Sequence, residues 1–142
     1  MAVSSTSSAP GILGIDYGET NIGLAFGRGG MVTPLRVVSG KNDNTAVSAI
    51  GRVAKEYKVA RFVVGLPLTV EGKETPQSLK VRKFVKVLKS QLKLPVDLVS
   101  EHSTSKGAVK VMLNAGVSQK RRRTKDHYSA AIILRRYFRN RT

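Results

Sequence analysis

The feature that most constrains the fold is a change in the spacing of apolar residues near residue 40. Before that point, residues 11–17, 21–27 and 31–38 form short apolar or alternating runs. Alternation with a period of two is typical of β-strands. The links between these runs, residues 18–20 and 27–30, are short and contain glycine. This first part of the chain therefore predicts three antiparallel strands joined by two hairpins.

After residue 40 the spacing becomes helical, and helices alternate with strands. Residues 42–59 and 75–94 carry apolar side chains every three or four positions, as amphipathic helices do. Residues 61–67 and 95–102 are short apolar runs, which is expected of strands covered on both faces. The whole order predicts an α/β fold, in which a mixed five-stranded sheet has three antiparallel strands, then two parallel ones, and helices on both faces.

The helix boundaries have specific signals. Thr75 can cap the second helix, and Pro76 stands at its first helical position. The apolar stripe of this helix is predicted to consist of Leu79, Phe84, Val87, Leu88 and Leu92. Two more helices are expected after the last strand, over residues 103–116 and 124–140, and Thr124 is the expected cap of the second.

The length and composition fit one globular domain. The chain has 142 residues and no internal repeat, so we expect a flexible tail over residues 1–10 and a single domain over residues 11–142. No apolar run approaches the ~20 residues of a membrane span. Residues 1–10 lack the charged and apolar regions of a secretory signal, so a cytoplasmic protein is expected. The absence of cysteine excludes disulfides, thiol catalysis and cysteine zinc sites.

The charge balance indicates a polyanionic partner. The chain has 25 Lys and Arg against 9 Asp and Glu, which gives a formal net charge of +16. A surface this basic attracts polyanions, of which nucleic acid is the commonest. An enzyme of small metabolites seldom needs such a field, so we expect nucleic-acid contact.

Three of the nine acidic residues stand where a common site can form. Asp16 ends the first strand, Glu101 ends the last strand, and Asp126 lies in the first turn of the last helix. The first strand of such a sheet is central, so Asp16 and Glu101 are expected at one edge, where ligands tend to sit. The last helix can close over that edge. Each acid alone would be an ordinary strand end or helix cap. The three together predict a site.

The chemistry of three carboxylates favours a metal ion. Carboxylates within ~4–6 Å of one another would raise each other's pKa unless a cation neutralised them. Hard cations such as Mg²⁺ or Mn²⁺ take oxygen ligands, and Mg²⁺ is usually held by one or two carboxylates together with substrate phosphate oxygens. We therefore predict that Asp16, Glu101 and Asp126 bind Mg²⁺ or Mn²⁺ and catalyse metal-assisted phosphodiester hydrolysis.

Basic residues cluster next to the predicted site. The loop before the last helix contains Lys120, Arg121, Arg122, Arg123 and Lys125. Because this loop adjoins Asp126, it is predicted to hold substrate phosphates without reading bases. Arg82, Lys83 and Lys86 are predicted to extend the basic track along the helix at 75–94. The ordinary alternative is a solvated charged surface.

Four blocks of the sequence resemble a known family. GIDYGETNIGLAFG, VVGLPLTVEGKETPQSLKVRKF, VDLVSEHST and KDHYSAAIIL are similar to segments of the YqgF-type (RuvX-like) proteins, in that family's order and spacing. These are ribonuclease H-like proteins assigned to Holliday-junction resolution and to maturation of the precursor of small-subunit ribosomal RNA. The resemblance covers nearly everything after residue 10. It implies a ribonuclease H-like sheet and a divalent-metal nuclease site at Asp16, Glu101 and Asp126.

The chain departs from the family pattern beside the predicted glutamate. The family usually has an acid before that glutamate and an arginine after it, where this chain has Ser100 and His102. It commonly has a basic residue where Asn21 stands. These departures leave the three acids intact but bear on how the substrate is held next to Glu101 and on the strength of the activity.

The predicted function is that of a metal-dependent endonuclease for structured nucleic acid. The substrate is either Holliday-junction DNA or the 5′ end of pre-16S rRNA. Junction resolution calls for a homodimer with twofold symmetry, whereas a monomer can process rRNA. One alternative is a non-catalytic rRNA-binding or ribosome-assembly protein, which would explain the charge but not the placement of the three acids. An ATP-binding domain of the actin and sugar-kinase type would need a second domain.

Overall fold

The computed structural model describes the backbone of residues 9–101 and 125–141, and the side chains of residues 9–101 and 128–141. The predicted helix over residues 103–116, the cap Thr124 and most of the predicted tail therefore lie outside the described residues. Within the described part, no helix is both long enough and apolar enough to cross a bilayer.

The described strands form one mixed sheet with the predicted directions. The strands are β1 (Gly11–Asp16), β2 (Asn21–Arg28), β3 (Met31–Ser39), β4 (Val59–Leu66) and β5 (Val96–Ser100). Their order across the sheet is β3-β2-β1-β4-β5, so the first strand is central. The β1–β2 and β2–β3 pairs are antiparallel, whereas the β1–β4 and β4–β5 pairs are parallel. This arrangement confirms the predicted α/β sheet.

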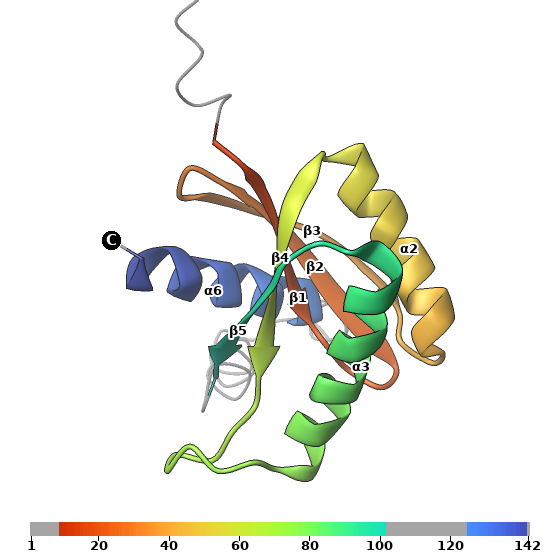
Figure 1. Cartoon of the computed structure of the whole chain (residues 1–142). Coiled ribbons are helices and arrows are strands. Elements are labelled where there is room, and N and C mark those ends of the chain that lie inside the picture. The colour runs from red at the N-terminus through yellow and green to blue at the C-terminus, as the bar shows by residue number, and fades with distance from the viewer. Residues whose placement is uncertain (1–8, 102–124, 142) are drawn as a thin grey trace, which may run out of the picture.

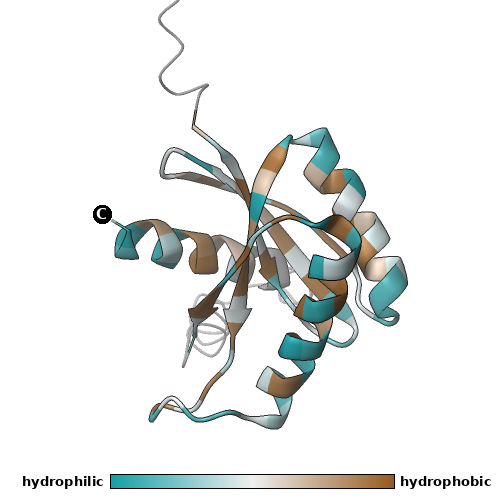
Figure 2. Cartoon of the chain, in the orientation of Figure 1, coloured by the Kyte–Doolittle hydropathy of each residue, from teal (hydrophilic) through white to brown (hydrophobic). Residues whose placement is uncertain are grey.

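Helices cover both faces of this sheet (Figure 1). Helices α2 (Asp43–Glu56) and α3 (Pro76–Leu92) lie side by side on one face, and α6 (Lys125–Asn140) crosses the other. Each face has its own apolar core, because strand side chains alternate between the two faces. In Figure 2 the strands are coloured mostly as hydrophobic, whereas hydrophobic and hydrophilic residues alternate along α2 and α3.

Helices α2 and α3 begin at side-chain caps. The carboxamide of Asn42 accepts a hydrogen bond from the Thr45 amide at 3.0 Å. At α3, the Thr75 hydroxyl accepts from the Ser78 amide at 2.9 Å, and the Ser78 hydroxyl accepts from the Thr75 amide at 2.8 Å. Such a reciprocal pair satisfies two backbone donors that a helix start leaves open. The predicted start of α3, with Pro76 in its first turn, is confirmed.

The predicted apolar stripe of α3 was wrong at Leu79, whose exposed fraction is 58%. The buried residues of this helix include Val81, Phe84, Val85 and Leu88. These four follow the i, i+3, i+4, i+7 spacing of one helical face. Leu79 lies two residues before Val81 and therefore about 200° around the helix, on the solvent side.

Glycines on the sheet bring α6 unusually close to the strands. A Cβ atom at Gly14 would lie 2.5 Å from Cγ of Leu134 and 3.0 Å from the carbonyl oxygen of Ala130. A Cβ atom at Gly27 would lie 2.7 Å from the ring of Phe138. Any larger residue at these positions would push the helix away from the sheet, because the contacts include backbone and branched side chains. Gly14 thus serves packing against α6.

Two lysines occupy the left-handed region of the backbone at the ends of α2 and α3. Lys58, just after α2, has a φ angle of 54°, and so does Lys93, the C-cap of α3. Glycine is the usual residue for this conformation, because a Cβ atom there meets the following carbonyl oxygen.

Replacing either lysine with glycine should therefore stabilise the fold. We expect Lys58→Gly and Lys93→Gly each to raise the free energy of unfolding by about 0.5–1 kcal/mol, since the relief of backbone strain exceeds the entropy cost of glycine. The same change at Lys86, inside α3, should lower it by about 1 kcal/mol. Urea denaturation of the three variants measures these differences, and destabilisation at Lys58 or Lys93 would contradict the assignment of strain.

Candidate active site

Asp16 is the last residue of the central strand and is buried, with an exposed fraction of 8%. Leu13 and Ile15 belong to the core under α2 and α3, whereas Ile12 belongs to the core under α6. Because strand side chains alternate, Asp16 lies on the α6 face. Its neighbour on β2 is Gly23, which contributes no side chain of its own beside the carboxylate.

Glu101 directly follows the edge strand β5 and is buried to the same degree. Its amide donates to the carbonyl oxygen of Leu66 at 3.1 Å, which continues the β4–β5 ladder by one residue. The carboxyl group lies over Gly65 of β4, where an added Cβ atom would be 2.8 Å from both Cδ and Oε1 of Glu101. The glutamate therefore occupies space that only a glycine at position 65 leaves open.

The register of the sheet brings Asp16 and Glu101 to the same place. Ile15 of β1 pairs with Val64 of β4, so the next residues along the two parallel strands put Asp16 beside Gly65. Neighbouring strands lie about 4.8 Å apart. On the α6 face, Gly65 thus has Asp16 beside it on the neighbouring strand β1 and the carboxyl group of Glu101 packed against it. They are 85 residues apart in the chain.

The other predicted site residues are described only in part. Asp126 is the second residue of α6, so its predicted place in the first turn of the last helix agrees with the backbone. Its side chain lies outside the described residues, as does that of Lys125. Lys120, Arg121, Arg122, Arg123 and His102 lie outside the described residues altogether.

The two described carboxylates fit a hard divalent cation. Asp16 and Glu101 offer oxygen donors, the ligand type that Mg²⁺ and Mn²⁺ prefer, and two glycines leave room beside them. Within the described part of the chain, no group of three potential protein ligands gathers at one point. Two carboxylates are still enough where substrate phosphate oxygens complete the coordination shell.

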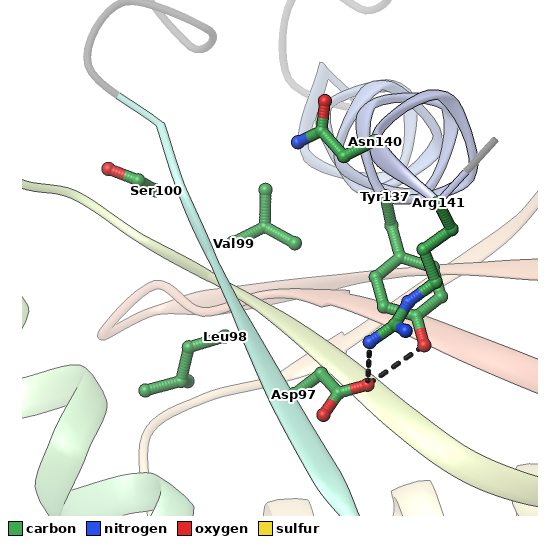
Figure 3. A pocket seen from close by; sticks show the side chains of 7 residues that line it. All are labelled: Asp97, Leu98, Val99, Ser100, Tyr137, Asn140 and Arg141. Carbon is green, nitrogen blue, oxygen red and sulfur yellow. Dashed lines mark hydrogen bonds and ion pairs between the residues drawn. The ribbon is translucent and has the colours of Figure 1, made fainter.

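An unpredicted polar cluster ties α6 to the edge strand (Figure 3). Oδ2 of Asp97 on β5 accepts hydrogen bonds from Nη1 of Arg61 at 3.0 Å, the hydroxyl of Tyr137 at 2.8 Å and Nη2 of Arg141 at 3.1 Å. The Arg141 guanidinium also lies 4.5 Å from the centre of the Tyr137 ring. Burial, and then the hydrogen bond to Asp97, raise the pKa of the Tyr137 hydroxyl.

A second contact fixes α6 next to Glu101. Nη1 of Arg136 donates to the carbonyl oxygen of Ser100 at 2.8 Å. Ser100 is one of the positions where the chain departs from the family pattern, and its residue is exposed. Since this contact uses the backbone, it does not depend on the side chain at position 100. Together with the Asp97 cluster, it positions the helix that carries Asp126.

One member of the predicted basic track on α3, Arg82, is already held in an ion pair. Nε of Arg82 donates to Oε1 of Glu74 at 3.0 Å, and Nη2 donates to Oε2 at 2.7 Å. Arg82 and then Ser78 lower the pKa of Glu74 to about 2. Lys83 and Lys86 are exposed. The guanidinium of Arg82 is thus already held by a carboxylate, whereas the two lysines keep the accessible charge that phosphate binding would need.

The low pKa of Glu74 can be tested by titration. The folded-state pKa lies below the ordinary value of 4.5, so the pair stabilises the fold above that pH and loses its contribution as pH falls toward 2. We expect carbon-detected NMR to show the Glu74 carboxyl titrating near pH 2 in the wild type. It should titrate closer to its ordinary value in Arg82→Gln. A midpoint near 4.5 in the wild type would contradict the bidentate pair.

The space under the two acids can be tested at Gly65. A Cβ atom there would lie 2.6 Å from Cδ1 of Ile133 as well as against Glu101. We expect Gly65→Ala to lower the free energy of unfolding by about 1–3 kcal/mol and to displace Glu101. Gly51→Ala is the matched control, because its Cβ would meet only the flexible end of Leu92, at 3.0 Å. An unchanged stability and an unmoved Glu101 in a crystal structure of Gly65→Ala would contradict the geometry.

Solved structures resemble this fold along nearly its whole length. Thermus thermophilus RuvC in complex with Holliday junction substrate superposes with a TM-score of 0.58 at 17% identity, covering 93% of this chain and 95% of that one. The fowlpox virus resolvase in complex with Holliday junction DNA superposes with a TM-score of 0.51 at 12% identity, covering 90% and 95%. At these identities the likeness concerns the fold, which is ribonuclease H-like, as predicted.

Sequence relatives are closer. A protein of Chloroflexus aggregans is 36% identical over 129 residues, which are 89% of this chain and 91% of that protein. One of Syntrophomonas wolfei is 35% identical over 129 residues, 89% of this chain and 92% of that protein. Both carry the name "Putative pre-16S rRNA nuclease".

The family described as "RuvX: Holliday junction resolvase" matches residues 11–140. This range includes every described strand and helix, together with both acids that flank Gly65. With this match, the RuvC-like sheet and the relatives above 30% identity, the chain belongs to the RuvX family.

Proposed function

We propose that this protein is a divalent-metal-dependent endonuclease that hydrolyses phosphodiester bonds in structured nucleic acid. The observation that carries the proposal is the pairing of two buried acids, Asp16 and Glu101, on either side of Gly65. Only nine acids occur in a chain of net charge +16, and two of them are buried together in the described part. Membership of the RuvX family supports the same reading.

In this proposal Asp16 anchors the metal from the central strand, Glu101 holds it from the edge strand, and Asp126 completes the site from α6. A bound Mg²⁺ or Mn²⁺ would polarise the scissile phosphate and lower the pKa of an attacking water. The burial of Asp16 and Glu101 strengthens their electrostatic action, because the local dielectric is lower than in water. The basic surface draws the polyanionic substrate towards the site. The Arg136 and Asp97 contacts keep α6 in place over β5.

Two substrates are compatible with this site, namely the 5′ end of pre-16S rRNA and a four-way DNA junction. Relatives are named for the first, and the family description names the second. Resolution of a junction needs two sites related by a twofold axis and hence a homodimer, whereas a single chain can trim rRNA. In either case we place the activity in the cytoplasm. A non-catalytic rRNA-binding protein is the outcome that remains if no cleavage occurs.

The decisive variant is Asp16→Asn, which keeps the shape of the side chain but removes its charge. We expect cleavage of labelled junction DNA or structured RNA, in Mg²⁺ or Mn²⁺, to slow by about 100-fold or more, because the several kcal/mol that metal ions contribute to the transition state are lost. Binding of the same nucleic acid in EDTA should be unchanged. Gel-based rates and binding isotherms measure the two effects.

The matched control is Glu71→Gln, which also removes one negative charge but lies in the exposed loop between β4 and α3. It should cleave at the wild-type rate. Thermal unfolding of both variants shows whether they are folded. Equal cleavage by Asp16→Asn and the wild type would reject the proposed role of Asp16. No cleavage of duplex DNA, junction DNA and RNA by the wild type with either ion would leave only the binding-protein alternative.

A further inference from the structure

A hollow of about 270 Å³ opens beside the carboxyl end of β1, on the sheet face opposite to Asp16. It is lined by Tyr17, Glu19, Gly40, Lys41, Asp43, Lys80 and Lys83. Tyr17 directly follows Asp16 and belongs to the α2/α3 side, where its ring lies 4.7 Å from that of Phe84. Its lining residues thus come from the β1–β2 turn, the start of α2 with the segment before it, and the first turns of α3.

The wall of the hollow is held by a close contact between two glycines. A Cβ atom at Gly40 would lie 2.3 Å from the carbonyl oxygen of Gly18, and one at Gly18 would lie 2.5 Å from the carbonyl oxygen of Asn21. The Gly40 amide donates to the carbonyl oxygen of Thr20 at 2.8 Å. The β1–β2 turn is therefore fixed against the segment that leads into α2, and the hollow has a defined shape.

The charges of the hollow leave two lysines available. The ammonium group of Lys80 is paired with the Glu19 carboxylate, and the Tyr17 hydroxyl donates to Oδ1 of Asp43 at 3.5 Å. Burial, and then the nearby carboxylates of Asp43 and Glu19, raise the pKa of the Tyr17 hydroxyl, so it stays a neutral donor. Lys41 and Lys83 form no ion pair with any other residue that the structure describes.

We propose that this hollow binds a backbone phosphate of the nucleic-acid substrate, one that neighbours the reacting phosphate. The inference rests on the proposed nuclease function, because it takes the acids around Gly65 as the reacting centre. Lys41 from the segment before α2 and Lys83 from α3 approach the phosphate from two sides, and Lys80 adds a third cation that Glu19 orients. Of these lysines, the sequence indicated only Lys83.

The position of the hollow fits a substrate strand that passes over the end of the sheet. Tyr17 and Asp16 are consecutive, so the hollow and the two acids lie at the same end of β1, on opposite faces of the sheet. Consecutive phosphates of one strand of a duplex advance by about 3.4 Å along its axis. A phosphate held by Lys41 and Lys83 would therefore belong to a nucleotide close to the one at Asp16. Such contacts fix the register of the substrate but carry no sequence information.

The double variant Lys41→Gln/Lys83→Gln tests the phosphate site. The matched control is Lys55→Gln/Lys58→Gln, which removes the same charge at the other end of α2, where both lysines are exposed. Binding of labelled junction DNA and of structured RNA is measured in EDTA, so no cleavage is required. We call Lys41→Gln/Lys83→Gln the pocket variant, because it changes the hollow. It should bind on the order of tenfold more weakly than the control at low salt, and the slope of log affinity against log salt concentration should be smaller by about 1.

Replacing single phosphates of the substrate by neutral groups identifies which phosphate Lys41 and Lys83 contact. Methylphosphonates are placed one at a time along the substrate strand. At one position they should weaken binding to the wild type and the control but leave binding to the pocket variant unchanged, because the partner lysines are already gone. Additive losses at every position, or equal affinities of the pocket variant and the control, would overturn the proposal.

The outcome is separable from that of the nuclease proposal. Coupling between the pocket and one phosphate without any cleavage would keep the phosphate site and reject the nuclease function. Cleavage that requires Asp16 without such coupling would keep the nuclease function and reject the phosphate site. Circular dichroism melting of both double variants checks that the fold is intact.

Discussion

The fold depends on how closely the last helix approaches the sheet. Gly14, Gly27 and Gly65 lie on the face that α6 covers, and a side chain at any of them would collide with that helix. The gap at Gly65 has a second occupant, since the Glu101 carboxyl group fills part of it. The absence of side chains at these glycines therefore has two effects. It lets α6 pack directly on the central strands, and it leaves room for a buried acid beside Asp16.

The polar contacts between α6 and β5 complete this arrangement. Asp97 accepts from three donors on one oxygen, of which Tyr137 belongs to α6 and Arg141 directly follows it, and Arg136 binds the backbone at Ser100. Partly exposed ion pairs of this kind contribute modestly to stability. Their effect on the site is positional, because they fix the helix that carries Asp126 relative to the strand that leads into Glu101. The proposed catalytic site is assembled from three distant segments and needs such supports to keep its geometry.

The sequence predicted those parts of the structure that depend on local pattern. Alternation and helical spacing gave the strands, their order and the start of α3 at Thr75, because these signals lie within a few neighbouring residues. It did not predict the exposure of Leu79, where one apolar residue lies off the face that its neighbours share. The Asp97 cluster was missed because its partners lie tens of residues away and no local pattern marks an acceptor of three donors. The meeting of Asp16 and Glu101 was expected from topology, but the role of Gly65 between them was not.

Direct observation of a bound ion tests the central claim, that Asp16 and Glu101 hold a divalent metal together. Mn²⁺ is paramagnetic, so its binding can be followed by the broadening of nearby amide signals in NMR spectra of the intact protein. Substoichiometric Mn²⁺ is expected to broaden the amides of Gly23 and Gly65 first, and excess Mg²⁺ is expected to reverse the effect. Neutralising either acid, as in Glu101→Gln, should abolish the broadening. Broadening centred elsewhere, or the same broadening in Glu101→Gln, would contradict the claim.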